Sequence, residues 1–139
     1  MTNQQILSHV DHTLLKAFAT WEDIQKLCDE AIEYQTASVC IPPCYIKRIH
    51  DTYGDKINIC TVVGFPLGYS TTKAKIAEVE QALEDGVNEV DMVINITDVK
   101  NGHFQEVFHE LFLRQIFDLQ NHQTDRLVHL KRNTQYHSA

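Results

Sequence analysis

The sequence predicts an α/β fold built from parallel (β/α) units. Strand-like and helix-like segments alternate four times along the chain, a pattern typical of parallel strands joined by right-handed helical crossovers. In the segment 89–95, Val90, Met92, Val93 and Ile94 place apolar side chains on both alternating sets of positions, as in a parallel strand covered on both faces. At 139 residues and 43% hydrophobic content, the chain is expected to form one domain. Two architectures use this repeat, an open doubly wound sheet and a (β/α)₈ barrel, of which four units would be half.

Four segments have the composition of strands, because they are short and rich in apolar and β-branched residues. They are residues 10–15, 37–41, 57–63 and 89–95. Pro42 and Pro43 end the second strand, since proline cannot continue a hydrogen-bonded ladder. The third strand opens into the turn-rich loop 64–68. We interpret this loop as structural rather than as a phosphate loop, because Lys73 stands at the wrong offset.

Between the strands, apolar residues recur at intervals of three and four, which predicts helices with one buried stripe. The helices are expected at 3–9, after Thr20, at 44–53, from Ser70 or Thr71 to Gly86, and from about His103. The residues predicted to face inward are Ile24, Leu27, Cys28, Ala31 and Ile32 in the second helix, Ile76, Val79, Ala82 and Leu83 in the fourth, and Phe104, Val107, Phe108 and Leu111 in the last. Lys73, Lys75 and Lys100 are interpreted as solvated.

Charge and composition exclude several classes of protein. The formal charge of −7 and the lack of a basic patch argue against binding to nucleic acid or to an anionic membrane. No apolar run approaches the roughly 20 residues of a membrane span. The first residues lack the layout of a signal peptide, so a cytoplasmic protein is expected. The four cysteines, Cys28, Cys40, Cys44 and Cys60, lack zinc-site spacing and are interpreted as buried reduced thiols.

Asp91 is the residue that most needs an explanation. It interrupts the apolar strand 89–95, and a carboxylate in such a place is costly unless it is paired, hydrogen-bonded or protonated. One interpretation is structural, with Asp91 capping an element or pairing with a cation. The other is functional, with the carboxylate aimed into a site and available for proton transfer. Asp11 beside His12 suggests a second polar cluster at a strand end.

Taken in order, the segments resemble those of the deoxyribose-phosphate aldolase family. The matching segments are Asp11-His12-Thr13-Leu14-Leu15-Lys16, Ala37-Ser38-Val39-Cys40-Ile41-Pro42-Pro43, Gly64-Phe65-Pro66-Leu67-Gly68 with Ser70-Thr71-Thr72-Lys73, and Glu89-Val90-Asp91-Met92-Val93-Ile94-Asn95. The resemblance extends from residue 6 to about 111. It implies a TIM barrel, of which residues 1–111 would supply the first (β/α)₄ half.

The resemblance also implies a reaction and roles for residues. Enzymes of this family are class I aldolases that use no metal or cofactor. A lysine forms a Schiff base with acetaldehyde, and the resulting enamine adds to glyceraldehyde 3-phosphate to give 2-deoxyribose 5-phosphate. Asp91 would be the proton donor and acceptor. The residues implied for the substrate pocket are Asp11, Thr13, Cys40 and Asn95.

The sequence departs from the family after about residue 111. The family's Schiff-base lysine and its neighbouring lysine belong to Lys-Val-Ile and Lys-Thr-Ser-Thr-Gly segments, and neither segment is present. Residues 112–139 form a divergent polar tail, expected to be partly disordered. Five of the eight histidines fall between His103 and Ala139, and this shift suggests an out-of-frame or degenerate tail. Lys131 has no apolar strand around it and is a poor candidate nucleophile.

Two functions therefore remain open, with a third less favoured. The first is an aldolase with half of its site, which we expect to be inactive alone because the Schiff-base lysine is missing. The second is a non-catalytic half-barrel that self-associates or binds a partner. An open flavodoxin-like binding domain is disfavoured, because no cofactor loop matches. Four strands cut from a closed barrel leave open edges, which predicts a homo-oligomer with Phe112 and Phe117 partly buried.

Overall fold

The structure, a computed structural model, describes residues 2–120 of the chain and the side chains of residues 2–112. Its strands are β1 (Asp11–Thr13), β2 (Ser38–Ile41), β3 (Ile59–Val63) and β4 (Glu89–Met92). Its α-helices are α1 (Asn3–Leu7), α2 (Trp21–Tyr34), α3 (Ile46–Tyr53), α4 (Thr72–Glu84), α5 (Ile96–Lys100) and α6 (Phe104–Gln120). Short 3₁₀ turns flank α3 at Pro43–Tyr45 and Gly54–Lys56.

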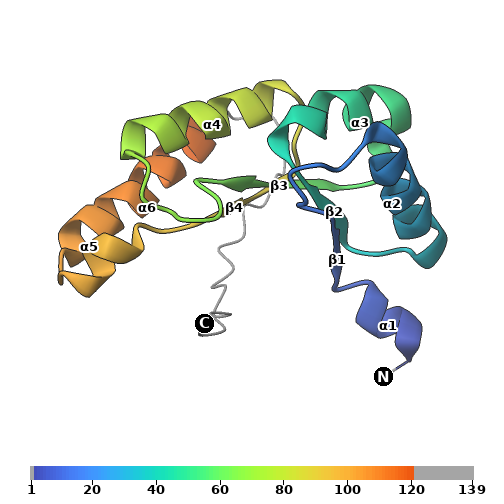
Figure 1. The fold of residues 1–139 in the computed structure, drawn as a ribbon, viewed down its shortest axis with the longest axis horizontal. Coiled ribbons are helices and arrows are strands. Elements are labelled where there is room, and N and C mark those ends of the chain that lie inside the picture. Colours follow the sequence, from blue (N-terminus) through green and yellow to red (C-terminus); the bar gives the residue numbers. More distant parts are fainter. Residues whose placement is uncertain (1, 121–139) are drawn as a thin grey trace.

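All four strands are parallel and lie in one sheet in the order β1-β2-β3-β4. Each strand therefore pairs with the next one along the chain. Helices α2, α3 and α4 line one face of this sheet (Figure 1). Sequential parallel strands with their crossover helices on one face are the arrangement of a (β/α) barrel wall. The predicted parallel (β/α) half-barrel is confirmed.

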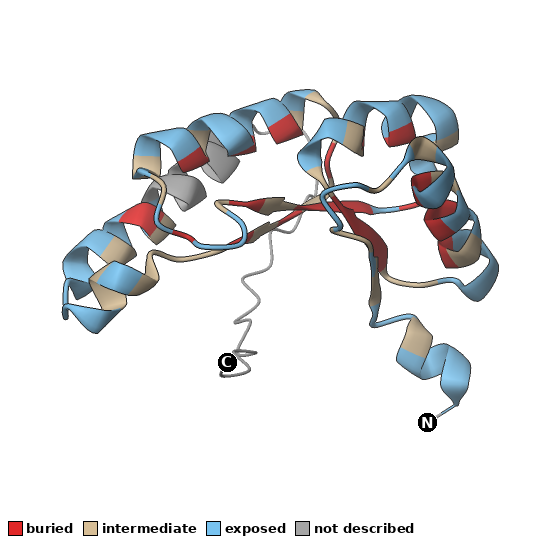
Figure 2. Cartoon of the chain, viewed as in Figure 1, coloured by how far each residue is buried: buried red, intermediate tan, exposed pale blue. Residues whose placement is uncertain are grey.

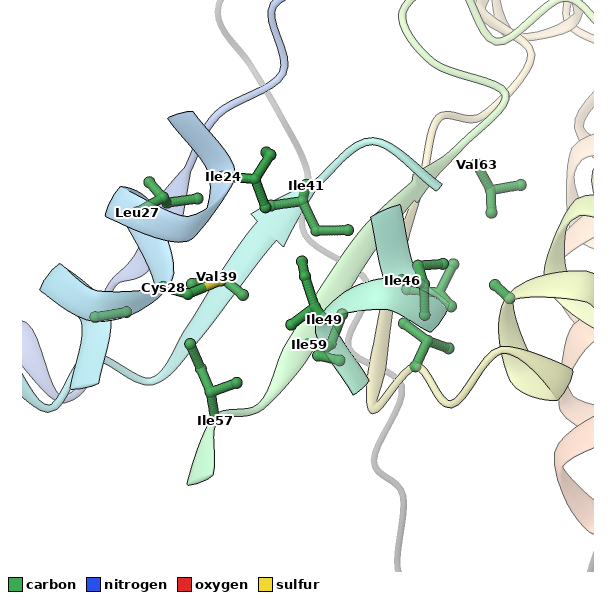
Figure 3. Close-up of a cluster of buried hydrophobic side chains, with 14 of the residues drawn as sticks. Ile24, Leu27, Cys28, Val39, Ile41, Ile46, Ile49, Ile57, Ile59 and Val63 are labelled. Atoms are coloured by element: carbon green, nitrogen blue, oxygen red, sulfur yellow. The ribbon is translucent and has the colours of Figure 1, made fainter. Parts of the chain in front are cut away.

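The hydrophobic core lies between the sheet and these helices. Strand residues at alternate positions meet apolar helix residues there (Figure 3). The strand residues of this core are Val39, Ile41, Ile59, Val63, Val90 and Met92, and the helix residues include Ile24, Leu27, Cys28, Ala31, Ile46, Ile49, Val79 and Ala82. Buried positions follow the sheet and the inner stripes of the helices (Figure 2).

The predicted start of α2 is confirmed. The Thr20 side chain accepts a hydrogen bond from the Asp23 amide, and the Asp23 carboxylate accepts one from the Thr20 amide. These bonds lower the pKa of Asp23, because they favour its charged form. Ile24, Leu27, Cys28 and Ala31 are buried as expected. Ile32 was wrongly predicted to be buried and is exposed.

The connection after β4 differs from the prediction. The strand ends at Met92 instead of Asn95, and helix α5 occupies residues expected to form a loop. Asn95 causes this change, because its side-chain oxygen accepts hydrogen bonds from the amides of Thr97 and Asp98. Such an N-cap satisfies the free amides of a helix start. The strand therefore ends three residues earlier than the apolar pattern predicts, and α5 begins at Ile96.

Lys75 was predicted to be solvated, and this prediction is wrong. Its side chain is 1% exposed and donates hydrogen bonds to the Val93 carbonyl (2.8 Å) and to Glu110 Oε1 (2.7 Å). The other Glu110 oxygen accepts the Asn95 amide at 3.3 Å. One buried ion pair thus joins α4, α6 and the residues that follow β4. A buried charge is tolerated only with such complete partners.

Helix α6 is oriented differently from the prediction. Phe104 and Phe108 were expected to face inward, but they are 65% and 63% exposed. Glu110 faces inward in their place to meet Lys75, and Leu111 packs against the core as predicted. Phe112 is 45% exposed and stacks on Phe108, with ring centroids 5.9 Å apart. The ion pair, rather than the aromatic pattern, sets the rotation of this helix.

Other expectations have mixed outcomes. Cys28, Cys40 and Cys60 are buried reduced thiols, whereas Cys44 is exposed. No helix among the described residues is long and apolar enough to cross a membrane. The predicted tail boundary at residue 112 falls inside α6. Residues 121–139, with Lys131, and the Phe117 side chain lie outside the described part of the structure.

We expect Lys75→Met to lower the free energy of unfolding by about 3–5 kcal/mol, because it leaves the buried Glu110 charge without its partner. Adding Glu110→Leu should restore most of that loss, since an apolar pair needs no charge compensation. Urea unfolding of both variants measures these values. The matched control is Lys73→Met at an exposed position, which should change stability by less than about 0.5 kcal/mol. A loss below about 1 kcal/mol in Lys75→Met would contradict this account.

Candidate functional site

A row of polar side chains crosses the sheet on the face opposite the core. The strand register pairs Thr13 with Cys40, Cys40 with Cys60, and Cys60 with Glu89. Side chains at every second position of a strand share a face, so Asp91 lies on this face as well. The sheet therefore has an apolar face against the helices and a polar face on its other side.

Asp11 and Thr13 belong to this polar face at the first strand. Ser38 is buried and donates its hydroxyl to Asp11 Oδ1 at 2.8 Å. Thr13 is exposed, and its hydroxyl donates to the Asp11 carbonyl at 2.9 Å. Ser38 thus fixes the direction of the Asp11 carboxylate. Thr13 remains accessible from solvent.

Cys40, Cys60 and Asp91 form the centre of the polar face. Their sulfur and carboxylate oxygen atoms lie within 4.8 Å of one another. Cys40 and Cys60 are buried, while Glu89 and Asp91 are half-buried. The Cys60 thiol donates toward Cys40, which lowers the pKa of Cys40. The same contact, together with burial and the nearby carboxylates, raises the pKa of Cys60.

Two predicted site residues have other surroundings. His12 does not share a cluster with Asp11, because it points to the helix face and meets Glu30 at 2.8 Å. Neighbouring residues in a strand face opposite sides, so this separation follows from the strand itself. Asn95 lies beyond the carboxyl end of β4, and its side-chain oxygen caps α5. The structure brings together Asp11, Thr13, Cys40 and Asp91 on one face and gives Asn95 a helix-capping contact.

The loop 64–68 has structural contacts, as expected. The Gly64 amide donates to the Glu78 carboxylate at 2.8 Å, so the amide is held by an anion of the protein itself. Gly68 has a positive φ of 70°, and a side chain there would collide with the Ile94 carbonyl and with Val93. Glycine is required at Gly68, since L residues rarely adopt this backbone conformation.

Sequence reasoning missed Ser38, Cys60 and Glu89. Ser38 has the same strand parity as Cys40, and Glu89 has the same parity as Asp91. Cys60 lies on a strand from which no residue was selected, and the parallel register places it beside Cys40. A complete assignment of strand faces could have found Ser38 and Glu89, whereas Cys60 needed the register. The register itself cannot be read from one strand, because it depends on how neighbouring strands align.

Four sequential parallel units with a polar inner face define the fold as half of a (β/α) barrel. The DeoC/LacD family aldolase profile matches residues 6–113. The chain belongs to the DeoC/LacD aldolase family. A deoxyribose-phosphate aldolase from Clostridium botulinum (strain Alaska E43 / Type E3) is 71% identical over 111 residues, which cover 80% of this chain and 50% of that protein. One from Clostridioides difficile (strain 630) is 55% identical, over 78% of this chain and 49% of that protein.

Solved structures agree with the sequence comparisons. The deoxyribose phosphate aldolase from Aeropyrum pernix, described as a tetramer, superimposes with a TM-score of 0.73 at 29% identity. The match covers 85% of this chain and 48% of that one. A structure from Coccidioides immitis, provisionally assigned as a deoxyribose-phosphate aldolase, gives 0.75 at 33% identity over 79% of this chain and 44% of that one. The chain spans about half the length of the curated relatives it matches.

Cys28 provides a pH-dependent test of the packing against the opposite face of the sheet. Burial raises its pKa from 9.0 to about 12, so the folded protein keeps this thiol protonated after the unfolded chain has ionised. Stability from this residue is therefore complete below pH 9 and is lost as pH rises from 9 to 12. Cys28→Ala should reduce the slope of unfolding free energy against pH by up to about 1.4 kcal/mol per pH unit in this range.

Urea unfolding under reducing conditions at several alkaline pH values measures that slope. Cys44→Ala is the matched control for removal of a thiol, because Cys44 is exposed. Parallel slopes for Cys28→Ala and the unmodified protein would refute the assignment.

Proposed function

We propose that this chain supplies the N-terminal half of a deoxyribose-phosphate aldolase site. The reaction is the reversible cleavage of 2-deoxyribose 5-phosphate to acetaldehyde and glyceraldehyde 3-phosphate. The main support is the position of Asp91, on the polar face of the sheet beside Cys40 and within the segment that matches the family. TIM-barrel enzymes use side chains near the carboxyl ends of their strands, and Asp91 lies next to the end of β4.

Asp91 is proposed as the proton donor and acceptor. Formation of an enamine requires removal of a proton beside an iminium, and a positioned carboxylate lowers that barrier. Asp11, Thr13, Cys40 and Asn95 are proposed to line the substrate pocket. The hydrogen bond from Ser38 to Asp11 supports this role, because a carboxylate of fixed direction can orient a substrate hydroxyl. Asn95 would take part through its position at the strand end, since its side-chain oxygen already caps α5.

The chain alone is proposed to lack the nucleophile. Its sequence has neither of the lysine segments that the family uses. Lys75 is buried, but its ammonium donates to Val93 and Glu110 at the core side of the sheet. It is therefore held in a structural ion pair. The Schiff-base lysine would have to come from residues outside the 139 of this sequence.

A second proposal is that the chain functions as a self-associating half-barrel. Within the described residues, β1 and β4 are the edge strands of the sheet, and open edges pair readily with other strands. Phe104, Phe108 and Phe112 add an exposed apolar stripe along α6 at intervals of four residues. A second copy could cover these features through a two-fold, self-complementary contact.

The isolated chain should show no cleavage of 2-deoxyribose 5-phosphate above the rate in buffer, because Asp91 can move protons but cannot form an imine. Incubation with this sugar phosphate and borohydride, followed by intact mass measurement, tests the expectation directly. The C. botulinum relative is the positive control and should gain the mass of a trapped adduct. An adduct on this chain, mapped to Lys16, Lys131 or any other lysine, would overturn the proposal of a missing nucleophile.

Light scattering of dilute protein should give the mass of a dimer or a larger assembly. Thr13→Pro tests whether the β1 edge takes part. The Leu14 amide donates to the Cys40 carbonyl, so by alternation the Thr13 amide points away from β2. Proline removes this outward donor, and we expect a shift toward monomer with the circular dichroism unchanged. A cooperatively melting monomer of the unmodified protein would rule out self-association.

A further inference from the structure

Two thiols and a carboxylate lie close together on the polar face. They belong to three consecutive strands. Cys40 of β2 and Cys60 of β3 are direct partners in the strand register, and Asp91 of β4 lies two positions beyond the partner of Cys60. Their ligand atoms all lie within 4.8 Å of one another. The three residues are 20 and 31 positions apart in the sequence, so local spacing gives no sign of the cluster.

We infer that Cys40, Cys60 and Asp91 form a binding site for a thiophilic divalent cation of the zinc and cadmium class. Two thiolates and a carboxylate are ligands that zinc accepts, whereas magnesium and calcium require oxygen donors. The inference concerns metal binding alone and does not depend on the proposed aldolase function. It also goes against the expectation from the sequence, which gave these cysteines no metal role.

The geometry suits such an ion after a small adjustment. Bond lengths of about 2.3 Å for zinc–sulfur and about 2.0–2.2 Å for zinc–oxygen place tetrahedral ligand atoms roughly 3.5–3.8 Å apart. The observed upper limit of 4.8 Å shortens to that range when side chains rotate toward a shared centre. The cluster lies on rigid paired strands, so the three Cα positions are already fixed. The fourth coordination position would be left for water or for Glu89, the partner of Cys60 in the register.

The two thiols differ in how easily they ionise. The contact from Cys60 lowers the pKa of Cys40, which eases formation of the first thiolate. The second thiol is harder to ionise, because burial and the negative charges around it raise the pKa of Cys60. A divalent cation removes that penalty by neutralising the thiolates, and its binding releases their protons.

Cadmium titration of the full-length, reduced and metal-free chain tests the inference. Cadmium bound to thiolate gives a charge-transfer absorption in the ultraviolet, and we expect it to saturate at one ion per chain. Cys60→Ser and Asp91→Asn should each weaken binding by at least about tenfold, as loss of ligands or of their supports does. The matched controls are Cys44→Ser, an exposed thiol, and Cys28→Ser on the opposite face. Both should bind cadmium as the unmodified chain does.

A measurement on the unmodified chain avoids any effect of substitution on folding. Cysteines are alkylated with and without cadmium, and each site is quantified by peptide mass spectrometry. Cadmium should slow alkylation of Cys40 and Cys60 and leave Cys44 unchanged. The inference is wrong if cadmium protects Cys44 instead, if no cysteine is protected, or if Cys60→Ser, folded by circular dichroism, retains full affinity.

Discussion

The parallel register of the four strands is the constraint on which the rest of this structure depends. Each strand pairs with its neighbour in sequence, and alternation then assigns every side chain to one of two faces. Val39, Ile59 and Val90 meet the helices, while Cys40, Cys60 and Asp91 meet one another on the other side. A shift of one residue in any pairing would exchange these sets and expose the core. Hydrophobic burial on one face therefore also fixes the chemistry of the other.

The Lys75–Glu110 pair connects the sheet to two helices. Lys75 lies on α4 and Glu110 on α6, and they also bind the Val93 carbonyl and the Asn95 amide after β4. Three segments distant in sequence therefore share one buried contact. Replacing such a pair with apolar residues can be neutral, but removing one partner is costly. The pair therefore specifies where α6 and the end of β4 lie more than it adds to stability. Because Asp91 is two residues before Val93, this contact also helps to hold the proposed catalytic strand.

The polar face carries both the proposed acid–base residue, Asp91, and the inferred cation ligands. In a closed barrel, such a face is enclosed by further strands, and the side chains that line it are shielded from water. Among the described residues, the sheet instead ends at β1 and β4, and Glu89 and Asp91 remain half-buried. The same geometry that supports the proposed acid–base role of Asp91 also places its carboxylate beside the buried thiols of Cys40 and Cys60. Assembly with a second polypeptide would change access to both.

The sequence by itself determined the fold class, the four strands and the start of α2, because apolar periodicity and caps such as Thr20 act over a few residues. It also singled out Asp91, since a charge within an apolar strand is conspicuous. Tertiary structure alone decided the burial of Lys75, the outward rotation of Phe104 and Phe108, and the meeting of Cys40 with Cys60. Each of these features depends on a residue of another element, 20 or more positions away in the sequence. Local sequence patterns predict which side of a segment is apolar. Packing and strand register determine which residues of other segments lie against that side.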